Sequence, residues 1–267
     1  MKKYLSGLLI ALLVVGCGGG SGGTSANSNA VGIPADVALT KSSTFLSKST
    51  GVLYPINVYV PADYARTSDA LPVIFTLDGE LSGGPFEVMR RILMDEGTRV
   101  ILVGVATAGK RDFDYLLPGA TDFYKFLSNE LVPSIEVDYR VNSKQRTLVG
   151  HSFGADFVQT ALTLDRPDKR VFRNFIAVDG PLRNPVENAQ LDNAMFLASA
   201  GKMPDTTFVY ASAGGAGFDS DVEAAYQKML ARNYQGLNLI RLPAYKTDHG
   251  GVFTPAITDV LHLLFKK

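Results

Sequence analysis

The stretch Gly150-His151-Ser152-Phe153-Gly154 has the pattern Gly-x-Ser-x-Gly. The residues before it, Arg146-Thr147-Leu148-Val149, form a short apolar run that is typical of a buried strand, and residues 156–164 after it have apolar side chains at helical spacing. A serine on a tight turn from a strand into a helix presents its hydroxyl above the end of the sheet. The pattern in this context predicts that Ser152 is a nucleophile.

The neighbours of Ser152 in this turn also have predicted roles. We expect Gly150 and Gly154 to be required, because side chains at both positions would clash with neighbouring backbone. The N–H of Phe153 lies at the start of the predicted helix, where it can face a developing negative charge on oxygen. Phe153 is therefore a predicted oxyanion-hole donor.

Strand and helix patterns alternate along the rest of the chain. This alternation predicts an α/β fold with a mainly parallel central sheet covered by helices on both faces. Ligands in such folds bind at the carboxyl ends of the strands, where Ser152 lies. The expected strands are 44–49, 53–60, 72–77, 100–105, 174–178, 207–211 and 238–242, and the expected helices are 85–95, 123–135 with an interruption at Pro133, 222–232 and 255–265.

A serine hydroxyl is a weak nucleophile and needs a base, and the chain has three histidines. His151 adjoins Ser152, so its side chain should point away from the nucleophile and pack within the turn. His262 falls among apolar residues of the last helix. His249 lies in a polar, glycine-rich loop, and loops provide catalytic groups more often than helix faces do. His249 is therefore the predicted base.

The acid that orients the histidine is expected in the loop 212–221, between the strand that ends at Ala211 and the next helix. Asp219 and Asp221 both lie in this loop. Asp221 has the better position to support the start of the helix, where aspartate accepts backbone N–H groups. Asp219 is therefore the predicted acid, with Asp221, Asp248 and a serine–histidine pair without a strong acid as alternatives.

The first 16 residues have the features of a secretory signal peptide. Two lysines precede the apolar stretch Leu8–Val15, which is too short to span a bilayer. The sequence Val14-Val15-Gly16-Cys17 resembles a bacterial lipobox, which implies cleavage before Cys17 and lipidation of its sulfur. The alternative is a plain signal peptide that ends in cysteine.

These features divide the chain into a signal peptide, residues 1–16, a lipidated cysteine with a flexible Gly/Ser-rich tether, residues 17–33, and one domain, residues 34–267. Gly18 is not the aspartate that marks inner-membrane retention of Gram-negative lipoproteins. By this resemblance we expect the protein in the cell envelope, at the outer membrane, facing the periplasm or the exterior. The 26 basic and 26 acidic residues balance, so the charge gives no reason to expect a nucleic-acid partner.

Several segments besides the serine turn match one family. They are Val58-Tyr59-Val60-Pro61 with Tyr64, Leu77-Asp78-Gly79, Arg111-Asp112-Phe113-Asp114-Tyr115, Phe126-Leu127, Glu130-Leu131-Val132-Pro133, Tyr139-Arg140 and Asp248-His249-Gly250. With these segments the chain resembles the esterase-D and enterochelin-esterase-like branch of the α/β-hydrolases over nearly all of the domain. The resemblance implies the α/β-hydrolase fold and hydrolysis of carboxylic esters or thioesters, including trilactone siderophores and acylated sugars. It also implies some acyl transfer, and neither a metal nor an organic cofactor.

The resemblance suggests roles for two further segments. The loop Leu77-Asp78-Gly79 matches the one that supplies the second oxyanion N–H, from Asp78 or Gly79. Arg111 matches an arginine near the mouth of the site, and the alternative is a structural pair with Asp112 or Asp114.

One position departs from the family pattern. Members often have a second glycine after the serine turn, whereas here Ala155 and Asp156 follow it. Asp156 would place a carboxylate close to the nucleophile and disfavour anionic substrates.

We therefore expect a lipid-anchored serine esterase that acts through an acyl-enzyme on a siderophore-like or other small acyl ester. Two alternatives remain open: an acyltransferase on the same scaffold, and a non-catalytic binding lipoprotein that retains the fold.

Overall fold

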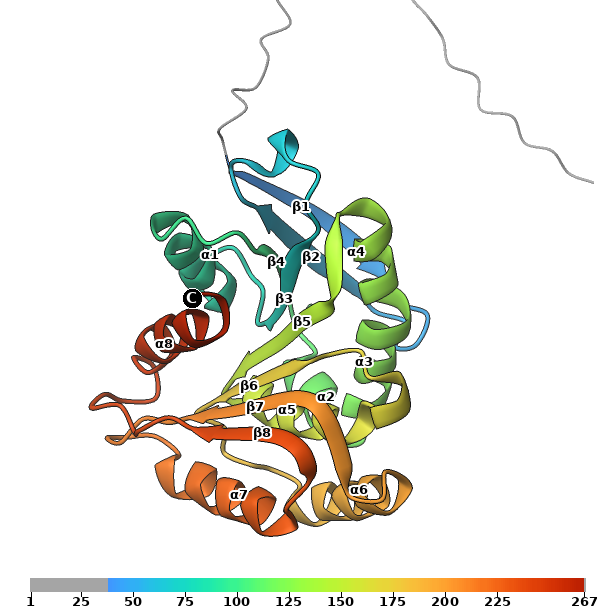
Figure 1. Cartoon of the computed structure of the whole chain (residues 1–267), viewed down its shortest axis with the longest axis vertical. Helices are drawn as coiled ribbons and strands as arrows, with labels where there is room; N and C mark the ends of the chain where they lie inside the picture. The colour runs from blue at the N-terminus through green and yellow to red at the C-terminus, as the bar shows by residue number, and fades with distance from the viewer. Residues whose placement is uncertain (1–37, 267) are drawn as a thin grey trace, which may run out of the picture. The chain divides into compact units, whose positions relative to one another are not determined.

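Eight strands form one sheet within residues 38–266, which are the residues that the computed structural model describes (Figure 1). Their order across the sheet is β1-β2-β4-β3-β5-β6-β7-β8. β1 and β2 run antiparallel to their neighbours, and every pair from β4 to β8 is parallel. The strands are β1 (Leu39–Leu46), β2 (Leu53–Val60), β3 (Leu71–Leu77), β4 (Ile101–Val105), β5 (Val141–His151), β6 (Asn174–Val178), β7 (Lys202–Ala211) and β8 (Gln235–Arg241).

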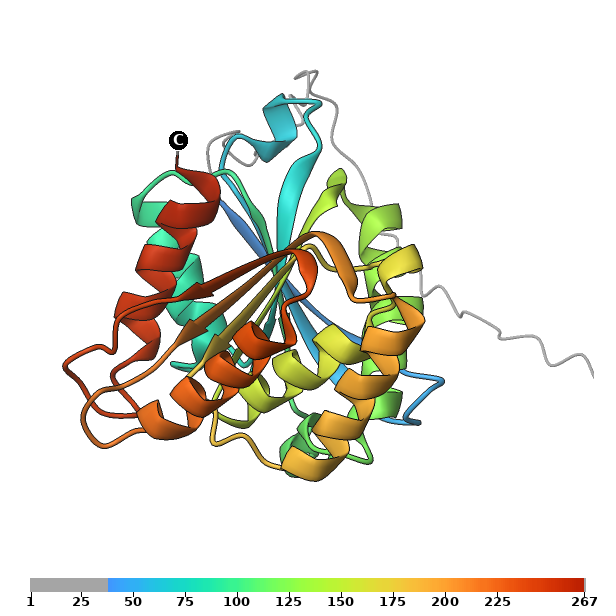
Figure 2. The same ribbon diagram turned by 60° about the horizontal axis from the view of Figure 1, so that its bottom comes forward.

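Helices cover both faces of this sheet, as Figure 2 shows with the last helix (red) on one side and most of the others on the opposite side. α1 and α8 pack against one face, around a core that includes Phe86 and Ile257. α3, α4, α5 and α7 pack against the other face, around a core that includes Phe157 and Phe208. The helices are α1 (Pro85–Asp95), α2 (Arg111–Tyr115), α3 (Ala120–Phe126), α4 (Val132–Asp138), α5 (Phe153–Leu164), α6 (Pro185–Ala198), α7 (Asp219–Arg232) and α8 (Phe253–Phe265). This arrangement confirms the predicted α/β-hydrolase fold.

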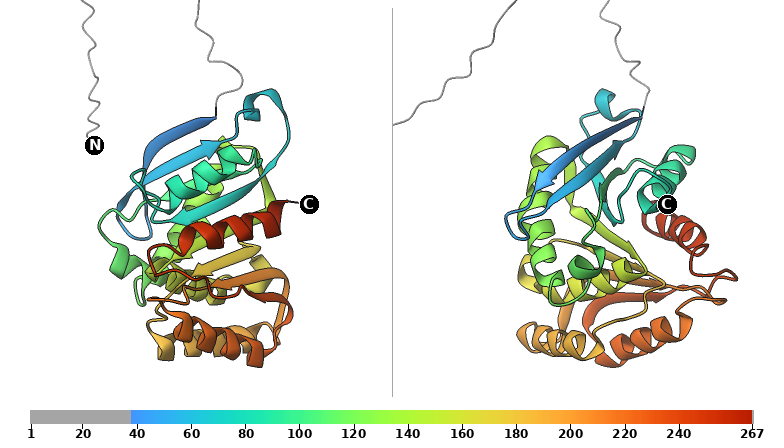
Figure 3. Two further views of the ribbon diagram at one scale, coloured as in Figure 1. Left: turned by 90° about the vertical axis from the view of Figure 1, so that its left-hand side faces the viewer. Right: turned by 180° about the vertical axis from the view of Figure 1, so that it is seen from behind.

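The burial of the central strands explains why their sequences are almost entirely apolar. β4 is buried along its whole length, and β3 is buried everywhere except at Pro72. A parallel strand with helices on both faces needs an apolar side chain at nearly every position. At the edges of the sheet lie the β1–β2 hairpin (blue in Figure 3) and the β7–β8 pair (orange and red).

The remaining elements differ from the sequence prediction for identifiable reasons. α6 was not predicted, because Met195 is its only buried residue and it therefore has no apolar stripe. Pro133 does not break the helical segment, since it lies at the beginning of α4, where a missing N–H costs nothing, directly after a π-helical turn at Leu127–Leu131. β7 begins at Lys202, before the apolar run that predicted it.

The predicted signal peptide and tether, including Cys17, lie outside the described residues. The described residues belong to one unit, Pro34–Lys267. Within residues 38–266, no helix has the length and apolar character needed to cross a membrane.

Candidate active site

Ser152 connects the end of β5 to the start of α5 in a strained turn. Its φ is 59° and its ψ is −125°, a backbone conformation that residues other than glycine rarely adopt. The strain is held by the sheet, because the Ser152 N–H donates to the carbonyl oxygen of Val178 on β6 at 3.0 Å. Such conformations persist only where the surroundings enforce them, and they cluster at functional sites.

The two glycines of the turn differ in the space that a side chain would find at their positions. A Cβ at Gly150 would lie 2.1 Å from the carbonyl oxygen of Gly154, so no side chain fits there. A Cβ at Gly154 would lie 3.5 Å from the side chains of Leu77 and Asp78, which is ordinary contact. The expectation that both glycines are required by space is therefore wrong for Gly154.

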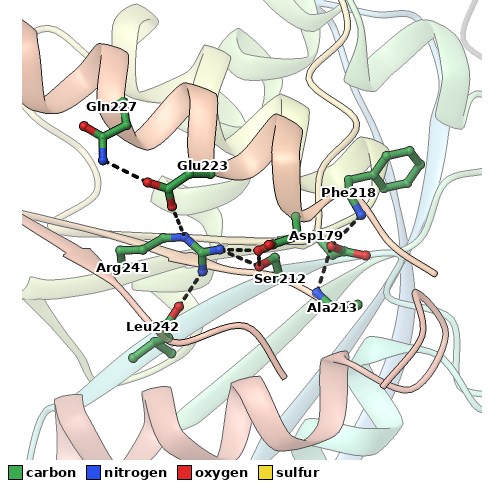
Figure 4. A network of polar contacts seen from close by, with 9 residues as sticks. Asp179, Ser212, Ala213, Phe218, Glu223, Gln227, Arg241 and Leu242 are labelled. Carbon is green, nitrogen blue, oxygen red and sulfur yellow. Dashed lines mark hydrogen bonds and ion pairs between the residues drawn. The ribbon is translucent and has the colours of Figure 1, made fainter. Parts of the chain in front are cut away.

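His249 is paired with a buried carboxylate, Asp179. His249 Nδ1 lies 2.7 Å from Asp179 Oδ2, and Asp179 is 0% exposed. Asp179 directly follows β6, the strand next to β5 in the sheet. Its second oxygen, Oδ1, accepts the backbone N–H groups of Ala213 and Phe218, each at 3.0 Å (Figure 4). One carboxylate oxygen is thus fixed by backbone, and the other is left for the imidazole.

Asp219, the predicted acid, does not contact His249. Its Oδ1 accepts hydrogen bonds from Ser212 Oγ at 2.5 Å and from Arg241 Nη2 at 2.6 Å. Figure 4 shows Arg241 between Ser212 and Glu223, at the junction of β7, β8 and α7. Asp219 therefore ties the start of α7 to the end of the sheet, and the structure gives the contact with the imidazole to Asp179.

The alternatives Asp221 and Asp248 form no hydrogen bond with the imidazole either. Asp221 is exposed in the first turn of α7, where no side chain caps the helix. Asp248 Oδ1 accepts the N–H of Gly251 at 2.8 Å. The sequence offers Asp179 as a further candidate, because this aspartate directly follows the apolar run 174–178 and keeps the order serine, acid, histidine, as Asp219 does.

His151 packs against the imidazole of His249. Their ring centroids lie 4.6 Å apart with an interplanar angle of 26°, and His151 Nε2 lies 2.9 Å from the carbonyl oxygen of His249. His151 must carry its proton on Nε2 to donate this bond. Burial lowers the pKa of His151 to about 4, so the ring is neutral near pH 7. The predicted packing role is therefore specific: His151 supports the histidine loop.

The predicted oxyanion donors differ in their availability. Phe153 is the first residue of α5, so its N–H has no acceptor within the helix. The N–H of Gly79 donates to the carbonyl oxygen of Val105 at 3.0 Å, and the N–H of Asp78 donates to the hydroxyl of Tyr115 at 3.0 Å. Gly79 is thus committed to the sheet, and Asp78 could serve only by sharing or leaving Tyr115.

Arg111 pairs with Asp78 rather than with Asp112 or Asp114. Arg111 Nε lies 2.6 Å from Asp78 Oδ1, and Nη2 lies 3.0 Å from Oδ2. Nη2 also donates to the carbonyl oxygen of His151 at 3.2 Å, and the guanidinium lies 5.4 Å from the ring centroid of Phe153. This bidentate pair fixes the loop after β3 against the serine turn.

The side chain of Asp156 is bonded to the loop after β6. Its carboxylate is buried and accepts the backbone N–H groups of Leu182 and Arg183, each at 2.8 Å. Burial raises the pKa of Asp156 to about 6. The carboxylate is therefore bonded to the loop after β6, and its effect on anionic substrates stays a prediction.

A cavity of about 330 Å³ lies between α5, α6 and α7. Asp156, Leu182 and Arg183 line one part of it, whereas Ser152 and His249 are not among its lining residues. The cavity is therefore adjacent to the site and not the site itself.

His262 has the structural role that its position in the last helix predicted. Its Nε2 lies 2.7 Å from Glu96 Oε1, which joins α8 to the end of α1. Within the described residues, no group of three or more His, Cys, Asp or Glu side chains is arranged to hold a metal ion.

Comparison with known proteins shows that this chain is similar to esterases. The family model described as "Putative esterase" matches residues 47–185. Over 59 residues, 22% of this chain, the sequence is 42% identical to the ferri-bacillibactin esterase BesA of Bacillus subtilis (strain 168). Over 143 residues, 47% of the chain, it is 28% identical to an endo-1,4-beta-xylanase/feruloyl esterase of Xylanibacter ruminicola. The matched segment spans 19% of the length of each of these two relatives.

A solved structure supports the same grouping. The chain is similar to an IroE-like serine hydrolase from Shewanella oneidensis, with a TM-score of 0.70 and 25% sequence identity. This similarity covers 85% of the present chain and 80% of the other.

The burial of His151 predicts a specific pH dependence of stability. Its pKa is about 4 in the folded protein and about 6.5 when unfolded, so the unfolded chain binds more protons between these values. The folded protein should therefore lose up to about 3 kcal/mol of unfolding free energy as the pH falls through this window. Comparing His151→Gln with wild type by urea unfolding at pH 7 and pH 4.5 isolates this contribution. Equal changes in both proteins would contradict it.

Proposed function

This chain belongs to the putative esterase family, and we propose that it is a serine esterase that hydrolyses carboxylic esters through an acyl-enzyme on Ser152. The observation that carries the proposal is the fully buried Asp179 carboxylate, 2.7 Å from His249 Nδ1. Because β5 and β6 pair in parallel, Ser152 and Asp179, which follow them, lie at the same end of the sheet. Nucleophile, base and acid at one edge are the parts that acyl transfer needs.

In the first half of the reaction, Ser152 Oγ attacks the acyl carbonyl carbon and its proton passes to His249 Nε2. Asp179 accepts the Nδ1–H of His249, which fixes the tautomer that leaves Nε2 free to take the proton, and its charge stabilises the imidazolium. The tetrahedral intermediate then collapses. The bond to the alcohol breaks, His249 returns the proton to the departing oxygen, and the acyl group remains on Ser152.

In the second half, His249 takes a proton from water, which attacks the acyl-enzyme. Collapse of the second tetrahedral intermediate releases the acid, and the proton returns to Ser152 Oγ. The N–H of Phe153 is the proposed donor to the oxyanion in both halves, since it faces no acceptor in α5.

The proposed substrate is a small acyl ester of the siderophore kind. The family resemblance and the name of the Bacillus subtilis relative, a ferri-bacillibactin esterase, support this class.

We also propose that the protein is held in the cell envelope through a lipidated Cys17. The lipobox-like Val14-Val15-Gly16-Cys17 and the Gly/Ser-rich residues after it support this location.

Replacing Ser152 or His249 should abolish turnover while the fold is retained. Ser152→Ala and His249→Ala are each expected to lower kcat about 10⁴-fold or more, because either loss disables the acyl-transfer step. The assays use a 4-nitrophenyl ester and a trilactone siderophore, and a fluorophosphonate probe should label Ser152. His262→Ala, which removes a histidine bonded to Glu96, serves as the control and should keep its rate. Labelling of a different residue would refute the proposal.

The two candidate acids are separated by one pair of variants. Asp179→Asn should lower kcat about 10⁴-fold, since an amide would favour the wrong tautomer of His249. Asp219→Asn should leave kcat within a few-fold and lower the thermal midpoint, because it weakens the contact of Asp219 with Arg241. The steady-state rate and the unfolding temperature of each variant decide the matter. The reverse ranking of the two rates would return the role to Asp219.

The lipid anchor predicts the mass of the mature protein. The chain extracted from membranes should begin at Cys17 and carry more than one acyl chain, because a single chain binds a bilayer only marginally. Cys17→Ser should move the protein out of the detergent phase, and the turnover of this variant should equal that of a chain that begins after residue 17. Intact mass spectrometry is the deciding measurement, and an unmodified mature mass would exclude the anchor.

A further inference from the structure

Asp156 is a buried carboxylate whose hydrogen-bond partners lie in the loop that carries Asp179. It occupies the first turn of α5, where its N–H bonds the carbonyl oxygen of Ser152 at 3.3 Å. Its Oδ1 accepts the N–H of Leu182 and its Oδ2 accepts the N–H of Arg183. The same helical turn therefore holds both Ser152 and the loop after β6.

We propose that Asp156 is a positioning residue, which fixes the loop 179–184 and thereby keeps the Asp179 carboxylate aligned with His249. This inference rests on the proposed function. Asp156 acts through Asp179 and has no contact with the reacting atoms in this role.

The conformation of the loop shows why it needs to be held. Asp179, Leu182 and Asn184 have φ values of 51°, 53° and 55°, in the left-handed region that costs free energy for any residue with a Cβ, less for Asp and Asn than for Leu. Three such residues within six positions make the loop unfavourable on its own, so the surrounding structure must impose it. The two N–H groups that Asp156 accepts belong to Leu182 and Arg183, so Asp156 bonds this part of the loop.

The carboxylate also approaches the backbone next to Asp179 very closely. A Cβ at Gly180 would lie 2.7 Å from Asp156 Oδ1 and 3.0 Å from the Cβ of Ala155. Gly180 thus leaves the space that the carboxylate fills, directly beside the acid.

Asp179 is then held from two sides. Ala213 and Phe218, in the loop after β7, donate to its Oδ1 and fix the carboxylate. Asp156 fixes the backbone that follows Asp179, at Leu182 and Arg183. Without the second restraint, the loop can relax toward favourable φ values, and the carboxylate would move relative to His249 Nδ1.

The chain contains a matched control at the other end of α5. Asp165 is also a buried carboxylate, and it accepts the N–H groups of Val171 and Phe172 at 2.8 and 2.9 Å. These residues precede β6, whereas Asp179 follows it. Asp165→Asn therefore disturbs the same kind of bonding, at the residue that directly follows α5 and at the opposite end of β6.

The test compares Asp156→Asn with Asp165→Asn in the full domain. An amide nitrogen cannot accept an N–H, so each variant loses one of the two bonds. Both should lower the thermal midpoint. Only Asp156→Asn should lower kcat, by about 10- to 100-fold as expected for a misplaced catalytic group, with KM changed less than about 2-fold. Only Asp156→Asn should also shift or broaden the downfield proton resonance of His249 Nδ1–H, which Asp179→Asn identifies by removing it.

Three results would overturn the inference: equal losses of kcat in both variants, a change in KM alone, or an unchanged resonance in Asp156→Asn. If Asp156→Asn does not fold, Gly180→Ala tests the same contact by forcing the carboxylate away, with the same readouts. The resonance does not require turnover. If wild type hydrolyses no ester, the proposed function fails, while the resonance still reports whether Asp156 positions Asp179.

Discussion

The parallel pairing of β3 to β8 is the constraint on which the site depends. Parallel strands in register end at one edge, so each loop that leaves that edge delivers its first residues to the same place. Asp78 follows β3, Ser152 follows β5 and Asp179 follows β6. Ser152 and Asp179 are linked through one residue, because the N–H of Ser152 donates to the carbonyl oxygen of Val178, which precedes Asp179. The chemistry therefore depends on strand register before it depends on any single side chain.

The fold and the serine turn could be predicted because their signals are local. A continuous apolar run marks a strand buried on both faces, as in β3 and β4. The Gly-x-Ser-x-Gly pattern sits between such a run and a helix, and the structure gives Ser152 the strained backbone that this context implies. The catalytic roles of Ser152 and His249 stay predictions until the variants are measured.

The acid could not be identified in the same way, because its identity depends on distances between loops. Aspartates follow both β6 and β7, and sequence alone does not show which of them reaches the histidine loop. The sequence predicts that Asp219 holds the imidazole, yet in the structure Asp219 pairs with Arg241 on strand β8. The resemblance implies a second oxyanion N–H from Asp78 or Gly79, yet the N–H of Gly79 continues the bonding between β3 and β4 at Val105. In both cases a partner far away in the sequence decides the role.

The two buried carboxylates at the ends of α5, Asp156 in its first turn and Asp165 directly after its last residue, have a joint mechanical consequence. Asp156 binds the loop that leaves β6, and Asp165 binds the residues that enter it. Helix α5 and strand β6 are thus bonded to each other at both ends. The nucleophile precedes α5 and the acid follows β6, so both are attached to one rigid unit. Backbone N–H groups make these bonds, so salt should loosen them less than it loosens exposed ion pairs. Extra room for a bulky ester has to come from outside this unit, from the exposed segment 81–83 after β3 or from the loop that carries His249.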